Sequence, residues 1–203
     1  MIHTRNRDAA LHAFRMKGGL LRTHQALARG IHPATLYRLA DEGQLIRLSR
    51  GLFRRADTPE FSNPDLAVVA AKAPDAVVCL ISALAFHGIT TQIPRAVYLA
   101  VPRGRYAGLR LTSPPVTVHR FDALTFKHGI EVHAIEGLSL RVYSVARTVV
   151  DCFKHRNKLG LDVALEALRL ARSRRQATNR EILPFARLLR QERVMAAYLQ
   201  CVI

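Results

Sequence analysis

The sequence predicts an α+β fold, with a winged helix-turn-helix at the N-terminus and a mixed α+β domain after it. Three observations lead to this prediction. Two short helical patterns joined by a tight turn lie between residues 21 and 42, and a small basic hairpin pattern follows at once. The rest of the chain mixes helical patterns with short β-rich runs. We expect residues 1–60 to form the first domain and residues 61–203 the second.

Two helices open the first domain. One is expected over residues 8–16, where alanines and Phe14 form an apolar stripe that ends before Gly18 and Gly19. Another is expected over residues 23–29, with Thr23 as its N-cap and Gly30 after its last turn.

A third helix is expected over residues 33–42 and is the candidate for insertion into a DNA groove. Pro at its first position has its φ preset for a helix and has no N–H to leave unpaired. Leu36, Leu39 and Ala40 share one face, which docks this helix on the two before it. The opposite face is left free for a partner.

A basic hairpin follows the third helix. Its strands are expected over residues 44–48 and 52–55, around the turn Ser49-Arg50-Gly51, in which Gly51 supplies a positive φ. Residues 56–63 contain Pro and turn-forming polar residues, which indicates a linker.

The second domain is expected to contain both helices and strands. Helices are expected over residues 64–73, 82–87, 145–154, 161–173, 179–189 and 191–201, and strands over 77–80, 97–101, 116–119, 130–135 and 138–143. Ser144 is placed to cap the helix that follows it. The i, i+4 spacing of Arg147 and Asp151 indicates an ion pair.

The chain is strongly basic. Its 203 residues include 31 Lys and Arg against 15 Asp and Glu, a formal net charge of +16. A protein this basic usually binds a polyanion, most often nucleic acid, although a GC-rich genome can also raise the arginine content. Residues 1–60 hold 11 basic and 5 acidic residues, and residues 61–203 hold 20 and 10. Both domains are therefore candidates for contact with nucleic acid.

The order of helices and hairpin predicts duplex DNA as the partner. On the third helix, Thr35, Tyr37 and Arg38 are expected to reach base edges or flanking phosphates, and Arg38 can pair with a guanine. In the hairpin, Arg50 at the tip suits a narrow minor groove, whereas a solvated charge set is the alternative. The expected DNA-binding residues are Arg22, His32, Thr35, Tyr37, Arg38, Arg47, Ser49, Arg50 and Arg54.

One of these residues, His32, has an open alternative. His32 either helps the helix N-terminus to hold a phosphate or serves only as the N-cap. Arg47 and Arg54 are expected on phosphates. Because one short helix reads only a few base pairs, we expect two copies of the chain on inverted repeats.

Five motifs follow one another along the chain: GQLIRLSRGLFR at 43–54, ISALAFHGI at 81–89, YLAVPRG at 98–104, YSVARTVVDC at 143–152 and LDVALEALRLARSR at 161–174. Together with the helix-turn-helix, this ordered set resembles the AbiEi family of antitoxin and autorepressor proteins over nearly the whole chain. The resemblance implies a repressor of its own promoter and operon. It also implies a functional partner, a nucleotidyltransferase-type toxin encoded beside it.

Enzymatic alternatives find little support in the sequence. There is no Gly-rich phosphate loop before a Lys-Ser/Thr pair, and Ser82 has no GxSxG setting. A metal-dependent nuclease would have to use His119, Asp122, His128, Glu131 and His133, which lack a recognised ligand spacing. We expect no catalytic residue, metal or cofactor. A module that only sequesters a partner protein is a third possibility.

The densest basic run lies near the C-terminus. Arg169, Arg172, Arg174 and Arg175 either make a second nucleic-acid contact or complement a helix C-terminus.

The three cysteines, Cys79, Cys152 and Cys201, form no CxxC pair and are expected in apolar surroundings. With no signal peptide and no apolar run long enough for a membrane span, a reducing cytoplasm is the expected location.

Overall fold

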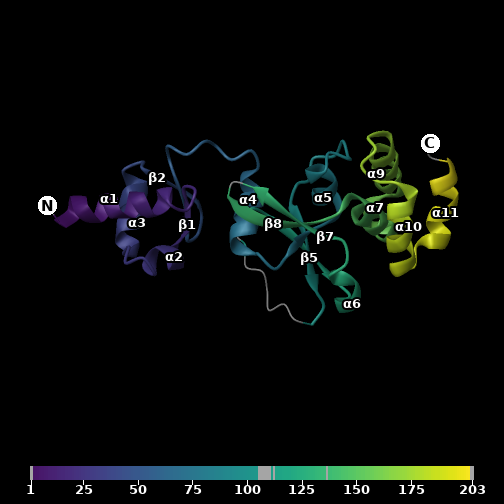
Figure 1. The fold of residues 1–203 in the computed structure, drawn as a ribbon, viewed down its shortest axis with the longest axis horizontal. Helices are drawn as coiled ribbons and strands as arrows, with labels where there is room; N and C mark the ends of the chain where they lie inside the picture. Colours follow the sequence, from purple (N-terminus) through teal and green to yellow (C-terminus); the bar gives the residue numbers. More distant parts are fainter. Residues whose placement is uncertain (1, 105–110, 112, 136, 202–203) are drawn as a thin grey trace. The chain divides into compact units, whose positions relative to one another are not determined.

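Helices and two β-sheets make up the fold, which confirms the predicted α+β class (Figure 1). The computed structural model describes residues 2–104, 111, 113–135 and 137–201, with only the backbone at 2–5 and 201. The contacts divide the chain into two units: an N-terminal unit of Met1–Ala73 with Ala134–Leu140, and a C-terminal unit of Pro74–His133 with Arg141–Ile203. The domain boundary expected at residue 60 stays a prediction.

The N-terminal unit has the element order of a winged helix-turn-helix. Its elements are α1 (Ile2–Arg15), β1 (Leu20–Arg22), α2 (Thr23–Leu27), α3 (Pro33–Asp41), β2 (Leu45–Ser49), β3 (Leu52–Arg55) and α4 (Pro64–Lys72). The strands form an antiparallel sheet in the order β1-β3-β2. Strand β1 was not expected, because three residues show no alternation and only pairing with β3 makes them a strand.

The core of the N-terminal unit confirms the packed face of α3. Leu36 and Leu39 are fully buried, together with Phe14 from α1 and Phe53 from β3. Each large apolar side chain buried in this way contributes about 1.5–3 kcal/mol to folding. The first two helices and the sheet therefore hold α3 by one face only, and its other face stays open.

One capping residue was predicted wrongly. The N-cap of α2 is Arg22, one residue before the expected Thr23, and the Arg22 backbone N–H donates to Gln25 Oε1 across 3.0 Å. The reason is strand β1, which keeps Arg22 extended (φ −84°, ψ 150°) and lets the helix begin directly at Thr23.

The C-terminal unit combines a mixed sheet with helices. Its helices are α5 (Leu80–Phe86), α6 (Ala123–Phe126), α7 (Val145–Lys154), α8 (Arg156–Leu159), α9 (Leu161–Ser173), α10 (Asn179–Leu188) and α11 (Glu192–Cys201). The strands of its sheet are β4 (Val77–Val78), β5 (Val97–Pro102), β6 (Val116–Phe121), β7 (Ile130–Ile135) and β8 (Leu138–Tyr143), in the order β6-β5-β4-β8-β7. The end of β7 and the start of β8 lie within the segment Ala134–Leu140, which is grouped with the N-terminal unit. Helix α7 packs against α5, α9 and α10 (Figure 1).

Two details of this unit depart from the expectations. The strand expected over residues 77–80 ends at Val78, and α5 already begins at Leu80, whose φ is +49°. Helices α6 and α8 were missed, because four residues are too few to show a helical period. Ser144 caps α7 as expected, its hydroxyl accepting from the Arg147 backbone N–H.

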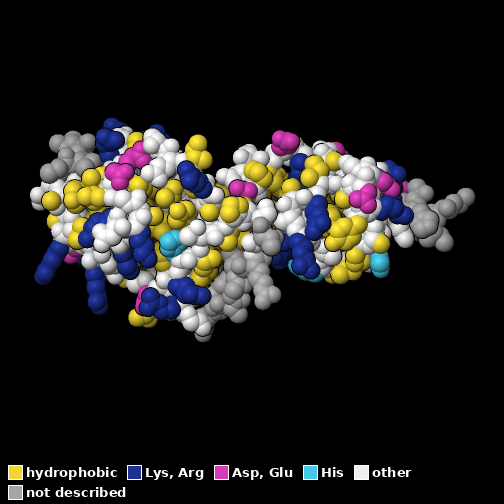
Figure 2. Space-filling model, turned by 180° about the vertical axis from the view of Figure 1, so that it is seen from behind, with side chains coloured by type: hydrophobic (Ala, Val, Ile, Leu, Met, Phe, Trp, Pro, Cys, Tyr) yellow, Lys and Arg dark blue, Asp and Glu magenta, His cyan; other side chains and the backbone are white. Residues whose placement is uncertain are grey.

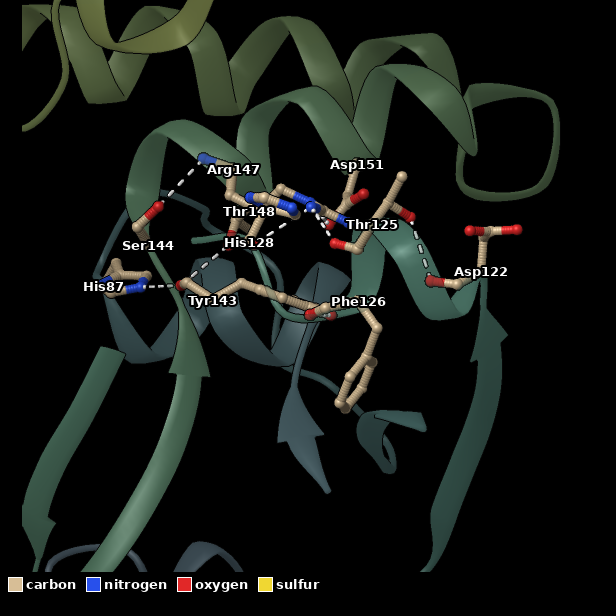
Figure 3. Close-up of polar contacts among 10 residues, drawn as sticks. All are labelled: His87, Asp122, Thr125, Phe126, His128, Tyr143, Ser144, Arg147, Thr148 and Asp151. Atoms are coloured by element: carbon tan, nitrogen blue, oxygen red, sulfur yellow. Dashed lines mark hydrogen bonds and ion pairs between the residues drawn. The ribbon is translucent and has the colours of Figure 1, made fainter. Parts of the chain in front are cut away.

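The YSVARTVVDC segment forms the centre of the C-terminal core. Arg147 and Asp151 form the expected i, i+4 ion pair, with both side chains buried (Figure 3). Arg147 also donates to the carbonyls of Thr125 and His128.

In the part of the chain that the structure describes, no helix is both long and apolar enough to cross a membrane.

Candidate nucleic-acid interface

Helix α3 begins on a defined cap. His32 is the N-cap, and its Nδ1 accepts from the Ala34 backbone N–H across 3.2 Å. Pro33 follows at the first helical position, as expected. The capping role of His32 is thus confirmed. The His32 side chain remains exposed, so it can still face a ligand at this end of the helix.

The open face of α3 meets the hairpin through Tyr37. This side chain is 43% exposed, and its ring lies edge-on to Phe53 of β3 with centroids 5.6 Å apart. The Arg47 guanidinium of β2 lies 5.8 Å from the Tyr37 ring centroid. Tyr37 therefore joins the open face of α3 to both strands of the wing through its contacts with Phe53 and Arg47.

Arg38 lies on the same helix with a weak restraint. Its Nε is 3.8 Å from Glu42 Oε1, and both side chains are about 40% exposed. Such an exposed pair contributes less than about 1 kcal/mol, so a DNA base or phosphate can replace Glu42 as the partner. Thr35, half-buried, lies in the first turn and donates its backbone N–H to His32.

The wing is the hairpin of β2 and β3. Gly51 has φ +72° at its turn, as the sequence predicted, and the register shifts between Arg47 and Ser49. Arg50 is exposed at the tip. The Gly51 carbonyl accepts from the Thr23 backbone N–H across 2.9 Å, so the start of α2 holds the tip in place.

Two expected contact residues lie inside the unit and are corrected here. Arg54 is 5% exposed; its guanidinium donates to the carbonyls of Thr58 and Pro59 and lies 5.4 Å from the Phe61 ring. Ser49 is 9% exposed, with its Oγ buried and without a partner among the described residues. On β3, Arg54 faces the linker rather than solvent, and so we remove Arg54 and Ser49 from the DNA-binding set.

Arg22 and a residue that the sequence did not single out lie beside the wing. Arg22, at the end of β1, is half-buried, and its burial lowers the pKa of its guanidinium. Lys72, in the last turn of α4, donates from its Nζ to the Arg50 carbonyl. The sequence gives little indication of this contact, because 22 residues separate Lys72 from Arg50. The one available signal was a Lys at the end of a helix.

The C-terminal arginines divide into structural and exposed residues. Arg172 donates to Asn179 Oδ1 and the Leu199 carbonyl at 3.0 and 2.9 Å, and Arg174 donates to the Gly88 carbonyl. These bonds tie α9 to its neighbours, which corrects the expectation of nucleic-acid contact for Arg172. Arg169 and Arg175 are exposed, and the charge of Arg169 helps to lower the pKa of the Glu166 carboxyl.

Four of the five histidines and acids considered for a metal site make other side-chain contacts. His119 stacks on Tyr98, His133 pairs with Glu131 at 3.2 Å, and Asp122 caps α6. Within the described residues, no group of three His, Cys, Asp or Glu side chains could hold a metal ion. Cys79 and Cys152 are buried thiols whose pKa values burial raises; the Cys201 side chain lies outside the described residues.

The molecular surface reflects the excess of basic residues. Figure 2 shows Lys and Arg side chains spread over the visible face, with fewer Asp and Glu among them. Charge alone therefore does not locate a binding site. The exposed face of α3 and the wing stand out because they combine cations with a projecting helix and an aromatic support.

Comparison with known proteins agrees with this geometry. Residues 8–56 match the family model described as "Transcriptional regulator, AbiEi antitoxin". This segment is therefore similar to the regulator domain of that family. The match includes α2, α3 and the wing, and it confirms the predicted resemblance over this segment.

A solved structure shares the wider fold. The crystal structure of the RV2827C protein from Mycobacterium tuberculosis superposes with a TM-score of 0.64 at 14% sequence identity, covering 97% of this chain and 76% of that one. At this identity the likeness concerns the fold alone. No curated protein sequence matches the chain significantly.

Proposed function

We propose that the protein is a DNA-binding autorepressor and the antitoxin of a toxin–antitoxin operon. The observation that carries the proposal is the surface on which Tyr37 joins the open face of α3 to Arg47 of the wing. Nine residues of α3 span about 14 Å, enough to place two turns in a major groove. The AbiEi match over residues 8–56 supports the regulatory role.

In this proposal the DNA contacts have separate tasks. Arg38 and Thr35 read base edges in the major groove, Arg50 enters the adjacent minor groove, and Arg47 and Arg22 hold phosphates. The exposed His32 adds a contact at the N-terminus of α3. Two copies on inverted repeats of its own promoter would extend the short site of one helix.

The toxin partner is proposed from the family. AbiEi-type regulators imply a nucleotidyltransferase-like toxin encoded beside them, and the C-terminal unit is the candidate for its neutralisation. The exposed Arg169 and Arg175 remain candidates for a second nucleic-acid contact. The protein acts by binding in the cytoplasm, where its promoter lies, and not by catalysis.

The test is binding of the full chain to its own promoter fragment. We expect a shift of that fragment at lower protein concentration than a scrambled duplex of equal length, with affinity falling steeply between 50 and 200 mM salt. Equal affinity for both duplexes, or affinity insensitive to salt, would contradict the proposal. Co-expression with the adjacent reading frame tests the antitoxin role. That reading frame expressed alone should arrest growth, and co-expression of this chain should restore it.

A further inference from the structure

The end of α4 lies against the wing. The Lys72 ammonium donates one hydrogen bond to the Arg50 carbonyl at the wing tip. An ammonium has three donors, so two N–H groups remain for another acceptor. Helix α4 belongs to the N-terminal unit by its contacts, although it lies outside the segment that matches the regulator family.

Three arginine charges near the wing act on this ammonium. Burial lowers the pKa of Lys72 first, and the charges of Arg22, Arg50 and Arg47, in that order, lower it further. The strand register agrees with the last place of Arg47 in this order. Arg22 pairs with Leu52 at the end of β1, next to the tip, whereas Arg47 pairs with Phe53 on the far strand β2.

The cluster lacks internal neutralisation. Across the described residues, no ion pair joins Arg22, Arg47, Arg50 or Lys72 to a carboxylate. The three cations nearest the tip, Arg22, Arg50 and Lys72, repel one another, so their convergence costs stability unless an anion joins them. Arg22 and Lys72 are also partly withdrawn from water, which strengthens their attraction for an anion.

We infer that Lys72, with Arg22 and Arg50, forms a phosphate-binding site in which α4 contributes to the DNA interface. The site would hold one backbone phosphate of the duplex beside the wing, while Arg47 and Tyr37 face α3. This inference rests on the proposed DNA binding and extends it. The DNA-binding module then ends after α4, and not before the linker at residues 56–63.

The test measures the salt dependence of promoter binding for the full-length Lys72→Gln variant. Losing one phosphate contact reduces the steepness of log K against log salt by about 0.9. When the salt concentration rises from 50 to 200 mM, the fold-loss of affinity should therefore be about three to four times smaller for the variant than for wild type. Lys72→Arg keeps the charge and should keep the slope. Lys17→Gln is the matched control. Lys17 is exposed and precedes β1, whereas Arg22 ends that strand, so this variant should also keep the wild-type slope.

The outcomes separate this inference from the proposed function. If wild type fails to bind its promoter or any duplex, both are overturned. If wild type binds and Lys72→Gln weakens binding without changing the slope, Lys72 only supports the wing, and the inference is wrong. It is equally wrong if Lys72→Gln and Lys17→Gln behave alike. A thermal melt of each variant shows whether the fold is intact.

Discussion

The Arg147 Nε donates to Asp151 Oδ2 across 2.9 Å, one turn apart on α7, with both side chains shielded from solvent (Figure 3). The Arg147 guanidinium is also 4.7 Å from the Tyr143 ring centroid and bonds the carbonyls of Thr125 and His128. One arginine thereby connects α6, the end of β8 and α7. The pair is a structural element of the core, which explains much of the YSVARTVVDC motif without assigning it a function.

Replacing Asp151 by Asn should destabilise the protein strongly. Removal of one partner leaves the Arg147 charge buried and unpaired, which costs about 3–5 kcal/mol of unfolding free energy. Urea unfolding followed by circular dichroism measures the loss. The double variant Arg147→Met with Asp151→Leu should lose less than the sum of the two single variants. A loss for Asp151→Asn below about 1 kcal/mol would show that the pair contributes little.

His155 should make the fold sensitive to acid. Burial lowers the pKa of His155 to about 4 from its ordinary 6.5, and the neighbouring His119, Lys154 and Lys158 act in the same direction. Between these values the unfolded chain binds the proton and the native chain does not, so stability falls as the pH is lowered from 6.5 to 4. Asp151, whose pKa burial raises to about 6, acts with the opposite sign.

The His155→Phe variant isolates this effect. Phe keeps the aromatic contact with Phe121, whose ring is 5.8 Å away and nearly parallel, and it removes the titrating group. The urea midpoint of the variant should fall less between pH 7.5 and pH 5 than that of wild type, and the Asp151 contribution cancels in the comparison. His12→Phe, an exposed control on α1, should follow wild type. Identical pH profiles for all three proteins would contradict this account.

The sequence predicted the helices and hairpin well where one element has its own signal. Pro33 begins α3, Gly43 follows its end, and Ser144 caps α7. The prediction failed where strand pairing determines the secondary structure, because β1 becomes a strand only by pairing with β3. It also wrongly placed Arg54 on a DNA phosphate, because the burial of a side chain on β3 depends on the linker that packs over it.

These two arginines provide a matched test of the wing. Arg54→Gln removes buried charged hydrogen bonds to the Thr58 and Pro59 carbonyls and should lower the unfolding free energy by about 1.5–3 kcal/mol. Arg50→Gln, at the exposed tip, should change stability by less than about 0.5 kcal/mol and weaken promoter binding. Melting curves and binding titrations on both variants decide the matter. If Arg50→Gln unfolds as readily as Arg54→Gln, the tip residue has a structural role instead.

Arg38 is the residue on which sequence discrimination should depend. Because its pair with Glu42 is exposed and 3.8 Å long, Arg38→Ala should leave the melting temperature nearly unchanged. If Arg38 reads a guanine, the variant loses about 1–3 kcal/mol of the preference for the promoter over a scrambled duplex. Arg29→Ala, on an exposed residue after α2, is the control and should keep that preference. A variant that binds both duplexes more weakly by the same factor would place Arg38 on a phosphate, because a phosphate contact is indifferent to sequence.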